Sequence, residues 1–431
     1  MPPSAVMIQR RRESINKKIP VSLCALILAS CTSSYPSVSN VNTRNDTVQL
    51  TFSWWGNDDR NEYTLEAIRR FEEKYPGIDV RCSYTEWSGY QVRNNVRMAS
   101  GSECDVMQIN FAWIDQYSPD GKGYYDIKQL TDVVDLTTID SSMLDYGMKE
   151  NRLNALPIAM NAQTVYINRT LYESYGLDVP VTWSDFLDAA KAMDGKVYPV
   201  SMIPKSAWLF CIAYAEQARG HSVFDEEGRL TFTAEDFKVM IEFYCMLVEE
   251  KVMPQMEYGD DYELSSGKTA GVVAWLSDAE NECAAAIENG YDIVTAPYTS
   301  MSGEPGHGWY VKPATMYAVS DNTEHPLEAG MLLNFLINSS EMAELQGLEK
   351  GVPLSSPARD TLEGLGMLDG IQYDAFERME EPALISKMRP VMENTDVIRY
   401  FQEACNEVLF DKSTAEEQGE VLCRKIKEIS G

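Results

Sequence analysis

The sequence predicts an α/β fold with more than one domain, and three observations support this prediction. The chain has 431 residues, which exceeds the usual size of a single domain. Its first β-rich stretch is followed by a helical pattern and then by further strands, an order typical of parallel α/β sheets. A second region with the same alternation begins near residue 163.

The first region begins with a strand at residues 48–55, where β-rich residues alternate in polarity. After a polar turn, apolar residues between 65 and 71 recur at the three-residue spacing of a helix. A Pro-Gly pair at 76–77 ends this helix. Residues 78–84 predict a second strand, and residues 105–110 predict a third that is short and buried.

The second region contains two clear helix starts. Thr182 and Thr233 are each followed three residues later by an aspartate, which is a capping-box pattern. Short strands are predicted at 272–275 and 291–297. Roughly the last 60 residues show mainly helical periodicity.

The N-terminus has the order of a secretory signal. Basic residues between 10 and 18 precede an apolar run at 21–29, which is too short to span a bilayer as a helix. The run leads into the letters LASC, which resemble a bacterial lipobox ending at Cys31. We therefore expect residues 1–30 to be a lipoprotein signal peptide and Cys31 to carry the lipid. An ordinary signal peptide with a chance cysteine is the alternative. Residues 31–46 have the polar composition of a flexible tether.

Composition excludes several classes of function. The net charge of −29 would repel phosphate backbones, which argues against nucleic-acid binding. The nine cysteines form no CxxC pair and there are only three histidines, so we expect no metal site and no cofactor. We expect most cysteines to be buried free thiols. No Gly-x-Ser-x-Gly, phosphate-loop or His-Glu-x-x-His motif occurs.

Aromatic side chains beside polar ones recur at predicted strand ends and loops. Trp and Tyr rings can pack on the C–H faces of sugars, while amide and acid groups bond to the hydroxyls. Such segments lie at 54–58, 86–90, 110–115, 206–208, 275–278 and 308–310. For any single Trp, ordinary core packing is the alternative. Trp54 and Trp55 must face opposite sides of a strand, and we assign Trp55 to the cleft because it adjoins the turn.

Segments covering most of the chain resemble one known family. The segments DVMQIN at 105–110 and YINR with PVTWSDF between 166 and 186 are fairly specific. The sequence resembles the extracellular solute-binding proteins of family 1, the maltose-binding-protein-like lipoproteins of bacterial sugar ABC importers. The resemblance implies the two-lobed, type II fold of periplasmic binding proteins, with discontinuous lobes joined by hinge strands that close on a sugar.

The resemblance also implies where the chain crosses between the lobes. Residues 47–158 and 316–356 would form the N-terminal lobe, and residues 159–315 and 357–431 the C-terminal lobe. Taken with the aromatic pattern, the candidate ligand-binding residues are Trp55, Asn57, Asp58, Trp87, Tyr90, Asn110, Trp113, Asp115, Asn161, Gln163, Trp208, Trp275, Asp278, Trp309 and Tyr310.

The function implied is binding without chemistry. A lipid-anchored monomer on the outer face of a bacterial cytoplasmic membrane would capture a carbohydrate and deliver it to the permease subunits of an ABC importer. The many Trp positions suggest an oligosaccharide. A surface-attached glycoside hydrolase is the alternative, but it needs two facing carboxylates, and 66 acidic residues make a chance pair uninformative. A sugar-sensing subunit would share the fold and differ only in its partner.

Overall fold

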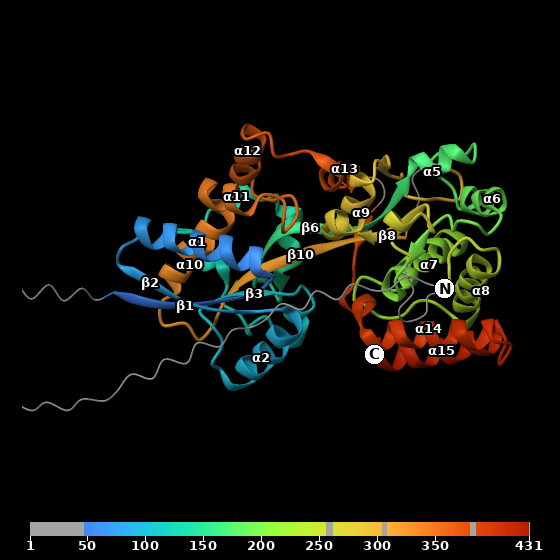
Figure 1. Cartoon of the computed structure of the whole chain (residues 1–431). Helices are drawn as coiled ribbons and strands as arrows, with labels where there is room; N and C mark the ends of the chain where they lie inside the picture. Colours follow the sequence, from blue (N-terminus) through green and yellow to red (C-terminus); the bar gives the residue numbers. More distant parts are fainter. Residues whose placement is uncertain (1–46, 256–261, 304–307, 380–384, 431) are drawn as a thin grey trace, which may run out of the picture. The chain divides into compact units, whose positions relative to one another are not determined.

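The computed structural model describes most of the chain beyond its N-terminal segment (Figure 1). The described residues are 47–255, 262–303, 308–379 and 385–430. The predicted signal peptide, Cys31 and the tether lie outside the described residues. Among the helices of these ranges, none is both long enough and apolar enough to cross a bilayer.

Nine strands of the described ranges form one sheet, in the order β2-β1-β3-β10-β6-β8-β7, with β11 beside β10 and β9 beside β6. Strand β1 pairs in parallel with both β2 and β3, as the strand–helix–strand order predicted. A separate hairpin pairs β4 with β5. The strands are β1 (Val48–Trp55), β2 (Ile78–Thr85), β3 (Val106–Ile109), β4 (Met148–Lys149), β5 (Arg152–Leu153), β6 (Leu156–Asn168), β7 (Ser201–Met202), β8 (Gly271–Trp275), β9 (Ile293–Thr295), β10 (Trp309–Val319) and β11 (Ile385–Lys387).

Several helices begin at residues whose side chains cap them. Asn57 accepts a hydrogen bond from the amide of Arg60 at the start of α1, and Thr182 and Thr233 form capping boxes at α6 and α8. The helices are α1 (Asp58–Lys74), α2 (Trp87–Ser100), α3 (Trp113–Tyr117), α4 (Ser141–Leu144), α5 (Arg169–Ser174), α6 (Trp183–Met193), α7 (Pro204–Arg219), α8 (Ala234–Glu249), α9 (Ala279–Glu288), α10 (Pro326–Asn338), α11 (Ser340–Gln346), α12 (Ser356–Gly364), α13 (Gly370–Met379), α14 (Thr395–Leu409) and α15 (Ala415–Ser430).

Two long strands connect the two parts of the sheet. Strand β6 has 13 residues and is buried throughout. Its first half pairs with β10 and its second half with β8 and β9. Strand β10 pairs with β11 at its start and with β3 at its end. Figure 1 shows both strands extending from the group of β1, β3 and α1 toward the group of β8, α7 and α8. The fold is the predicted α/β fold of two lobes joined by crossing strands.

Strand β10 is irregular where it passes β6. Their register shifts between Pro313 and Thr315 and again between Thr315 and Met316. Proline cannot donate a ladder hydrogen bond, so an irregularity beside Pro313 is expected inside a sheet. Such a bulge bends the strand locally and changes where neighbouring side chains point.

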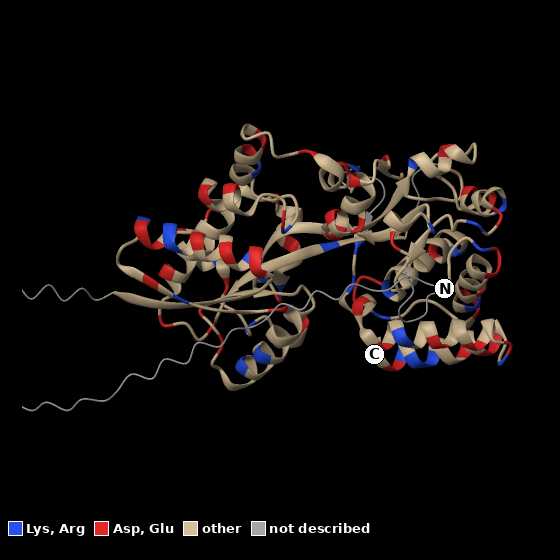
Figure 2. Ribbon diagram, in the orientation of Figure 1, with Lys and Arg blue, Asp and Glu red and all other residues tan. Residues whose placement is uncertain are grey.

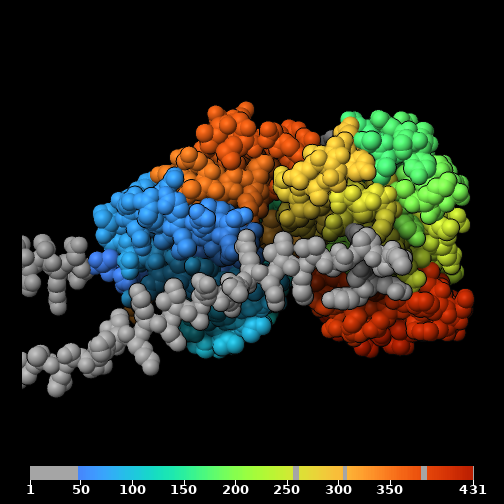
Figure 3. Space-filling model, in the orientation of Figure 1, coloured from blue at the N-terminus to red at the C-terminus, as the bar shows by residue number. Residues whose placement is uncertain are grey.

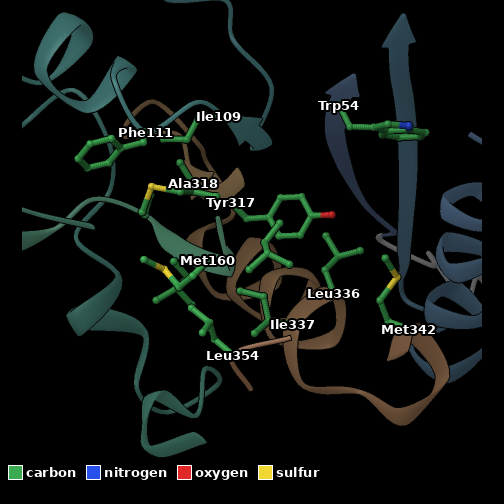
Figure 4. Packing of buried hydrophobic residues seen from close by; sticks show 14 of the residues in the cluster. Trp54, Ile109, Phe111, Met160, Tyr317, Ala318, Leu336, Ile337, Met342 and Leu354 are labelled. Atoms are coloured by element: carbon green, nitrogen blue, oxygen red, sulfur yellow. The ribbon is translucent and has the colours of Figure 1, made fainter. Parts of the chain in front are cut away.

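Two large clusters of buried side chains form the core. The first includes Trp54 and Tyr317 and packs β1, β3 and β10 against α10, as Figure 4 shows. The second includes Trp183 and Phe237 and packs α6, α7 and α8 with the C-terminal helices. Strand β6 contributes Tyr166 to the first cluster and the residues on either side of it to the second, because successive side chains point to opposite faces. Burying one such large apolar side chain contributes about 1.5–3 kcal/mol.

The cysteines behave as the composition predicted. The described cysteines are all free, and most of them are buried: Cys82, Cys104, Cys211, Cys245, Cys283, Cys405 and Cys423. Burial raises the pKa of several of these thiols, including those of Cys211 and Cys405, which disfavours the reactive thiolate. Acidic side chains are spread over many helices, whereas α2 carries arginines and no acidic residue (Figure 2).

Candidate ligand-binding site

A cavity of about 840 Å³ opens where segments distant in the sequence meet. Its walls come from the turn between β1 and α1, the start of α2, the turn between β8 and α9, the bulge of β10, the turn after α11, and α13. In the space-filling view the early residues of α1 adjoin residues of α9 (Figure 3). The lining residues are Trp55, Gly56, Asn57, Asp58, Arg60, Asn61, Glu86, Trp87, Ser277, Asp278, Glu280, Asn281, Ala314, Thr315, Glu349, Lys350 and Gln372.

The position of the cavity follows from the direction of the strands. Strands β1 and β2 are parallel and end together at Trp55 and Thr85, and β8 ends at Trp275, just before the lining residue Ser277. In α/β sheets, ligands bind beyond the carboxyl ends of strands. Loops that follow β1 and β2, on one side of the sheet, and β8, on the other side, therefore meet at one opening.

Alternation along β1 separates its two tryptophans. The indole of Trp54 is fully buried, stacks on Tyr84 with ring centroids 4.8 Å apart, and donates to Asn61 Oδ1 at 3.0 Å. Trp55 points to the other face and lines the cavity. The next residues form the capped start of α1, which presents Asn57 and Asp58 to the same space.

Four aromatic rings form a cluster at one wall of the cavity. Trp87 stacks on Trp113 with centroids 5.6 Å apart and an interplanar angle of 11°. Trp113 in turn stacks on Tyr90 at 6.0 Å, and Trp55 meets Trp87 edge to face at 4.9 Å. Only Trp55 and Trp87 line the cavity, so Trp113 and Tyr90 support them from behind. The cluster presents flat apolar surface to a ligand, which is what the C–H face of a sugar requires.

Tyr90 anchors this cluster to the sheet. Its hydroxyl donates to the carbonyl oxygen of Gln108 at 2.7 Å and lies 3.1 Å from Ser53 Oγ. Burial raises the pKa of Tyr90 well above its ordinary value, so the phenol stays neutral. The ring is therefore held in position by packing and by hydrogen bonds to β1 and β3.

A side chain from the crossing strand β6 holds the wall formed by the turn between β8 and α9. Asn161 Nδ2 donates to Ser277 Oγ at 2.9 Å, and the amide of Ser277 donates to Asn161 Oδ1 at 3.2 Å. This reciprocal pair fixes the turn that carries Asp278 into the cavity. Burial raises the pKa of Asp278, although Lys312 and Lys205 act in the opposite direction.

Trp275 lies beside this wall and is covered by cations. The ammonium groups of Lys312 and Lys205 lie 4.7 Å and 5.0 Å from the centroid of its ring. Lys312 donates to Glu393 Oε1 at 2.6 Å, and Lys205 bonds the same oxygen. Trp275 was predicted to bind the ligand, but it is not among the residues that line the cavity.

The deeper part of the cavity holds an ion pair. Arg60 donates to both carboxylate oxygens of Glu349, with Nη2 to Oε1 at 2.7 Å, and Tyr63 donates to Oε2 at 2.5 Å. Burial alone would raise the pKa of Glu349, but the hydrogen bonds and charge of Arg60 lower it below the ordinary value. The adjacent Lys350 is buried, and desolvation holds its pKa well below the ordinary lysine value.

The structure brings some predicted residues to this cavity and places others elsewhere. Trp55, Asn57, Asp58, Trp87 and Asp278 line it. Tyr90, Trp113 and Asn161 do not line the cavity. Trp113 and Asn161 contact the lining residues Trp87 and Ser277, and Tyr90 stacks on Trp113. Asn110 accepts from the amide of Ala112, which starts the turn leading to Trp113.

The remaining predicted residues contact other parts of the protein. Gln163 donates to Ser206 Oγ at 2.7 Å, and the Trp208 indole lies in the second core and donates to the carbonyl of Met392. Trp309 donates to the carbonyl of Thr299, and Tyr310 donates to Glu216. Each of these rings is buried because its helix or strand faces the second core there. Asp115 pairs with Lys149 at 2.6 Å beside a second cavity of about 540 Å³.

Several lining residues were not predicted from the sequence. Arg60 ends the predicted polar turn and Asn61 is the next residue, so both lie in the first turns of α1, where the sequence pattern could have indicated them. Pro313 within a strand pattern signals the bulge whose residues Ala314 and Thr315 line the cavity. Glu349 and Lys350 carry no local signal, because only the tertiary fold brings them to the cavity. Among the described residues, no group of acidic, His and Cys side chains is arranged to hold a metal ion.

Comparison with known proteins identifies related folds. The model of the family described as bacterial extracellular solute-binding protein matches residues 57–343. A multiple sugar-binding protein of Streptococcus mutans is 24% identical over 177 residues, which is 41% of this chain and 40% of that protein. This match therefore spans less than half the length of that relative.

Solved structures match over a larger share of the chain. A periplasmic oligogalacturonide-binding protein of Yersinia enterocolitica, in complex with saturated digalacturonic acid, is 28% identical with a TM-score of 0.79. The match covers 89% of this chain and 98% of that one. A de novo designed cysteine esterase is also 28% identical, with a TM-score of 0.81 and coverage of 89% and 98%.

Proposed function

Because the chain belongs to the family of bacterial extracellular solute-binding proteins, we propose that it is the carbohydrate receptor of an ABC-type importer. The observation that carries this proposal is the cavity in which the rings of Trp55 and Trp87 face the polar side chains of Asn57, Ser277 and Asp278. Aromatic faces and hydrogen-bonding groups together match the two kinds of surface that a sugar offers. The sugar-binding and oligogalacturonide-binding relatives support the same class of ligand.

The size of the cavity supports a ligand larger than one sugar ring. Its volume of about 840 Å³ lies within the range of roughly 300–1,000 Å³ that small-molecule sites occupy. The aromatic cluster lies at one wall and the ion pair of Arg60 and Glu349 at another, so different units of an oligosaccharide could contact different groups.

Binding would be coupled to movement of the two lobes. We assign residues 47–158 and 316–356 to one lobe and 159–315 and 357–431 to the other. The shared strands β6 and β10, and the bulge of β10 beside the cavity, support a hinge at this place. Closure would bring Ser277 and Asp278 toward the aromatic cluster and remove water from the sugar hydroxyls.

The remaining parts of the proposal concern location and partners. A lipid on Cys31 would hold the receptor on the outer face of the cytoplasmic membrane, and residues 31–46 would allow it to reach a permease. Tethering raises the local concentration of the loaded receptor near that partner. We propose that the receptor acts as a monomer and that its permease subunits release the sugar.

A carbohydrate-active enzyme and a sugar sensor are the alternatives. The residues that line the described cavity include acidic side chains but neither cysteine nor histidine, so a cysteine nucleophile like that of the designed esterase has no counterpart in this lining. A hydrolase would cleave the ligand, whereas a receptor returns it intact. A sensor would bind in the same cavity and differ in its partner.

The test is a thermal-shift screen of the mature chain against neutral and acidic mono- and oligosaccharides. A ligand that binds only the folded state raises the melting temperature. Trp87→Ala should remove most of the shift for the best ligand. Phe410→Ala is the matched control, because Phe410 is an exposed aromatic residue that does not line the cavity. Absence of any shift, or release of reducing sugar from a bound oligosaccharide, would contradict the proposal.

A further inference from the structure

Lys350 occupies an unusual position in the deeper part of the cavity. It lies in a turn between Gly347 and Gly351, both of which have left-handed backbone with φ of 53° and 98°. The side chain is almost fully buried, with an exposed fraction of 2%, yet it lines the cavity. Buried lysines are rare unless they are paired, so its surroundings need an explanation.

Among the residues that the structure describes, the ammonium group of Lys350 has one hydrogen-bond partner, the hydroxyl of Tyr317, at 2.7 Å. It also lies over the rings of Tyr317 and Tyr63, at 5.2 Å and 5.5 Å from their centroids. An ammonium group has three donors. Within the described residues it forms no ion pair with a carboxylate, so donors remain for a group that enters the cavity.

The neighbouring charges leave Lys350 without compensation. Among the described residues, Glu349 is the anion that acts on Lys350, and that carboxylate is already held by two donor nitrogens of Arg60 and by the Tyr63 hydroxyl. With Lys350 protonated, Arg60, Lys350 and Glu349 therefore sum to one positive charge at this wall of the cavity. This contrasts with a chain whose net charge is −29. A buried charge costs free energy until an opposite charge approaches it.

We propose that Lys350 is a specificity-determining residue that binds the carboxylate of an acidic sugar, and that the ligand is a saccharide with a single uronate unit at this depth. The inference rests on the proposed carbohydrate function and specifies its ligand class. The carboxylate would take the free donors of Lys350, while the rest of the saccharide lies against Trp55 and Trp87.

The sign and number of charges favour a carboxylate over a phosphate ester. The uncompensated charge is one, which matches a singly charged group. The acidic residues Asp58, Glu86, Asp278 and Glu280 also line this cavity and would repel further negative charge. A doubly charged phosphate, or a saccharide with acids along its whole length, would meet that repulsion.

The experiment uses matched disaccharides that differ only in one C6 group: hydroxymethyl, carboxylate, carboxylate methyl ester or phosphate. Gluco, galacto and manno series are measured by titration calorimetry on the mature chain. In the series that binds best, the carboxylate member should bind at least about tenfold more tightly than the hydroxymethyl, ester and phosphate members. Equal or tighter binding of a neutral member would overturn the inference and leave the proposed function intact. Binding by no member of any series would instead contradict the proposed function itself.

Substitution of the lysine provides the second arm. Lys350→Met keeps the length and apolar body of the side chain but removes its charge. It should therefore remove the preference, so that the carboxylate and hydroxymethyl members bind this variant with affinities within about twofold of each other. Lys74→Met is the control, because Lys74 is exposed and does not line the cavity. Equal loss of affinity for acidic and neutral members would mean that Lys350 only supports the structure, and would overturn the inference.

A double variant guards against a folding defect. Lys350→Met leaves the Tyr317 hydroxyl without its partner, so Lys350→Met with Tyr317→Phe removes both groups of the pair. The double variant should keep the melting temperature of the ligand-free protein and still lose the carboxylate preference. Retention of that preference in a folded double variant would overturn the inference.

Binding should also change the protonation of the site. Arg60, Tyr63, Tyr317 and Glu349 are the charged and titratable groups that face Lys350. Because an entering carboxylate favours the charged lysine, binding should take up a proton over the pH range in which the ligand-free lysine titrates. Calorimetry at a series of pH values, in two buffers of different ionisation enthalpy at each, detects this uptake. Proton uptake that persists in Lys350→Met would contradict the assignment.

Discussion

The indole of Trp87 stacks on that of Trp113, with ring centroids 5.6 Å apart and planes inclined by 11°. The two rings differ in environment, since Trp87 has an exposed fraction of 39% and Trp113 of 3%. One ring therefore faces the cavity and the other supports it. This division of roles predicts different effects for the same substitution at the two positions.

Trp113→Ala should destabilise the protein by about 3–5 kcal/mol, because it leaves a void behind Trp87 and Tyr90. Trp87→Ala should change the free energy of unfolding by less than about 1 kcal/mol, because the ring is already partly in water. Urea unfolding of both variants measures the difference. Similar losses of stability in the two variants would contradict the supporting role of Trp113.

Glu349 should make stability fall in acid. Hydrogen bonds and charge from Arg60 outweigh burial and hold its pKa below the ordinary value of 4.5. Its contribution is therefore present above pH 4.5 and is lost as the pH falls through the lower pKa of the folded state. Glu349→Gln should reduce this part of the acid dependence, which urea unfolding at a series of pH values below 5 tests. An unchanged pH profile in the variant would exclude Glu349 as its source.

Glu216 should act in the opposite direction. Burial raises its pKa to about 7, although Tyr310 and the amide of Val223 donate to it. Between about pH 4.5 and pH 7 the unfolded chain has lost this proton while the folded protein still holds it. The free energy of unfolding therefore falls as the pH rises through this range. Glu216→Gln should exceed the wild type in stability at pH 8, by on the order of 1–3 kcal/mol, and match it near pH 4. Denaturant unfolding at the two pH values is the measurement, and a variant that is less stable at both would disprove the prediction.

Gly351 should not tolerate a side chain. Its φ is 98°, and a Cβ there would lie 2.9 Å from the Cβ of Ala159 on β6. Gly351→Ala should cost more than about 2 kcal/mol, through backbone strain and this contact together. Gly366→Ala is the control, since its φ of 67° is also left-handed but nothing lies within 4 Å of the added Cβ. Equal costs for the two variants, measured by urea unfolding, would show that the contact with Ala159 is unimportant.

Much of the fold could be predicted from local patterns. The alternation at 48–55, the helix stop at 76–77 and the capping boxes of Thr182 and Thr233 all correspond to observed elements. These features depend on neighbours within a few residues, so the sequence contains them directly. The parallel pairing of β1 with β2 and β3 followed from the order of the elements.

The candidate site was less accessible to sequence reasoning. Trp55 was distinguished from Trp54 by strand alternation, whereas nothing local separates a core tryptophan such as Trp208 from one that lines a cavity. Aromatic and polar neighbours occur in both environments. Glu349 and Lys350 lie almost 300 residues from Arg60 in the chain, and only the packing of α11 against α1 brings them together.

The double register shift in β10 has a mechanical consequence. The regular pairing of β10 with β6 is interrupted between Pro313 and Met316, whereas the residues on either side of this stretch are paired. Ala314 and Thr315, which lie within the interruption, also line the cavity. A molecule that contacts these two residues therefore contacts the irregular stretch of the connecting strand. If this stretch forms part of the proposed hinge, substitutions of Ala314 or Thr315 that tighten ligand binding should also change the rate at which the lobes open.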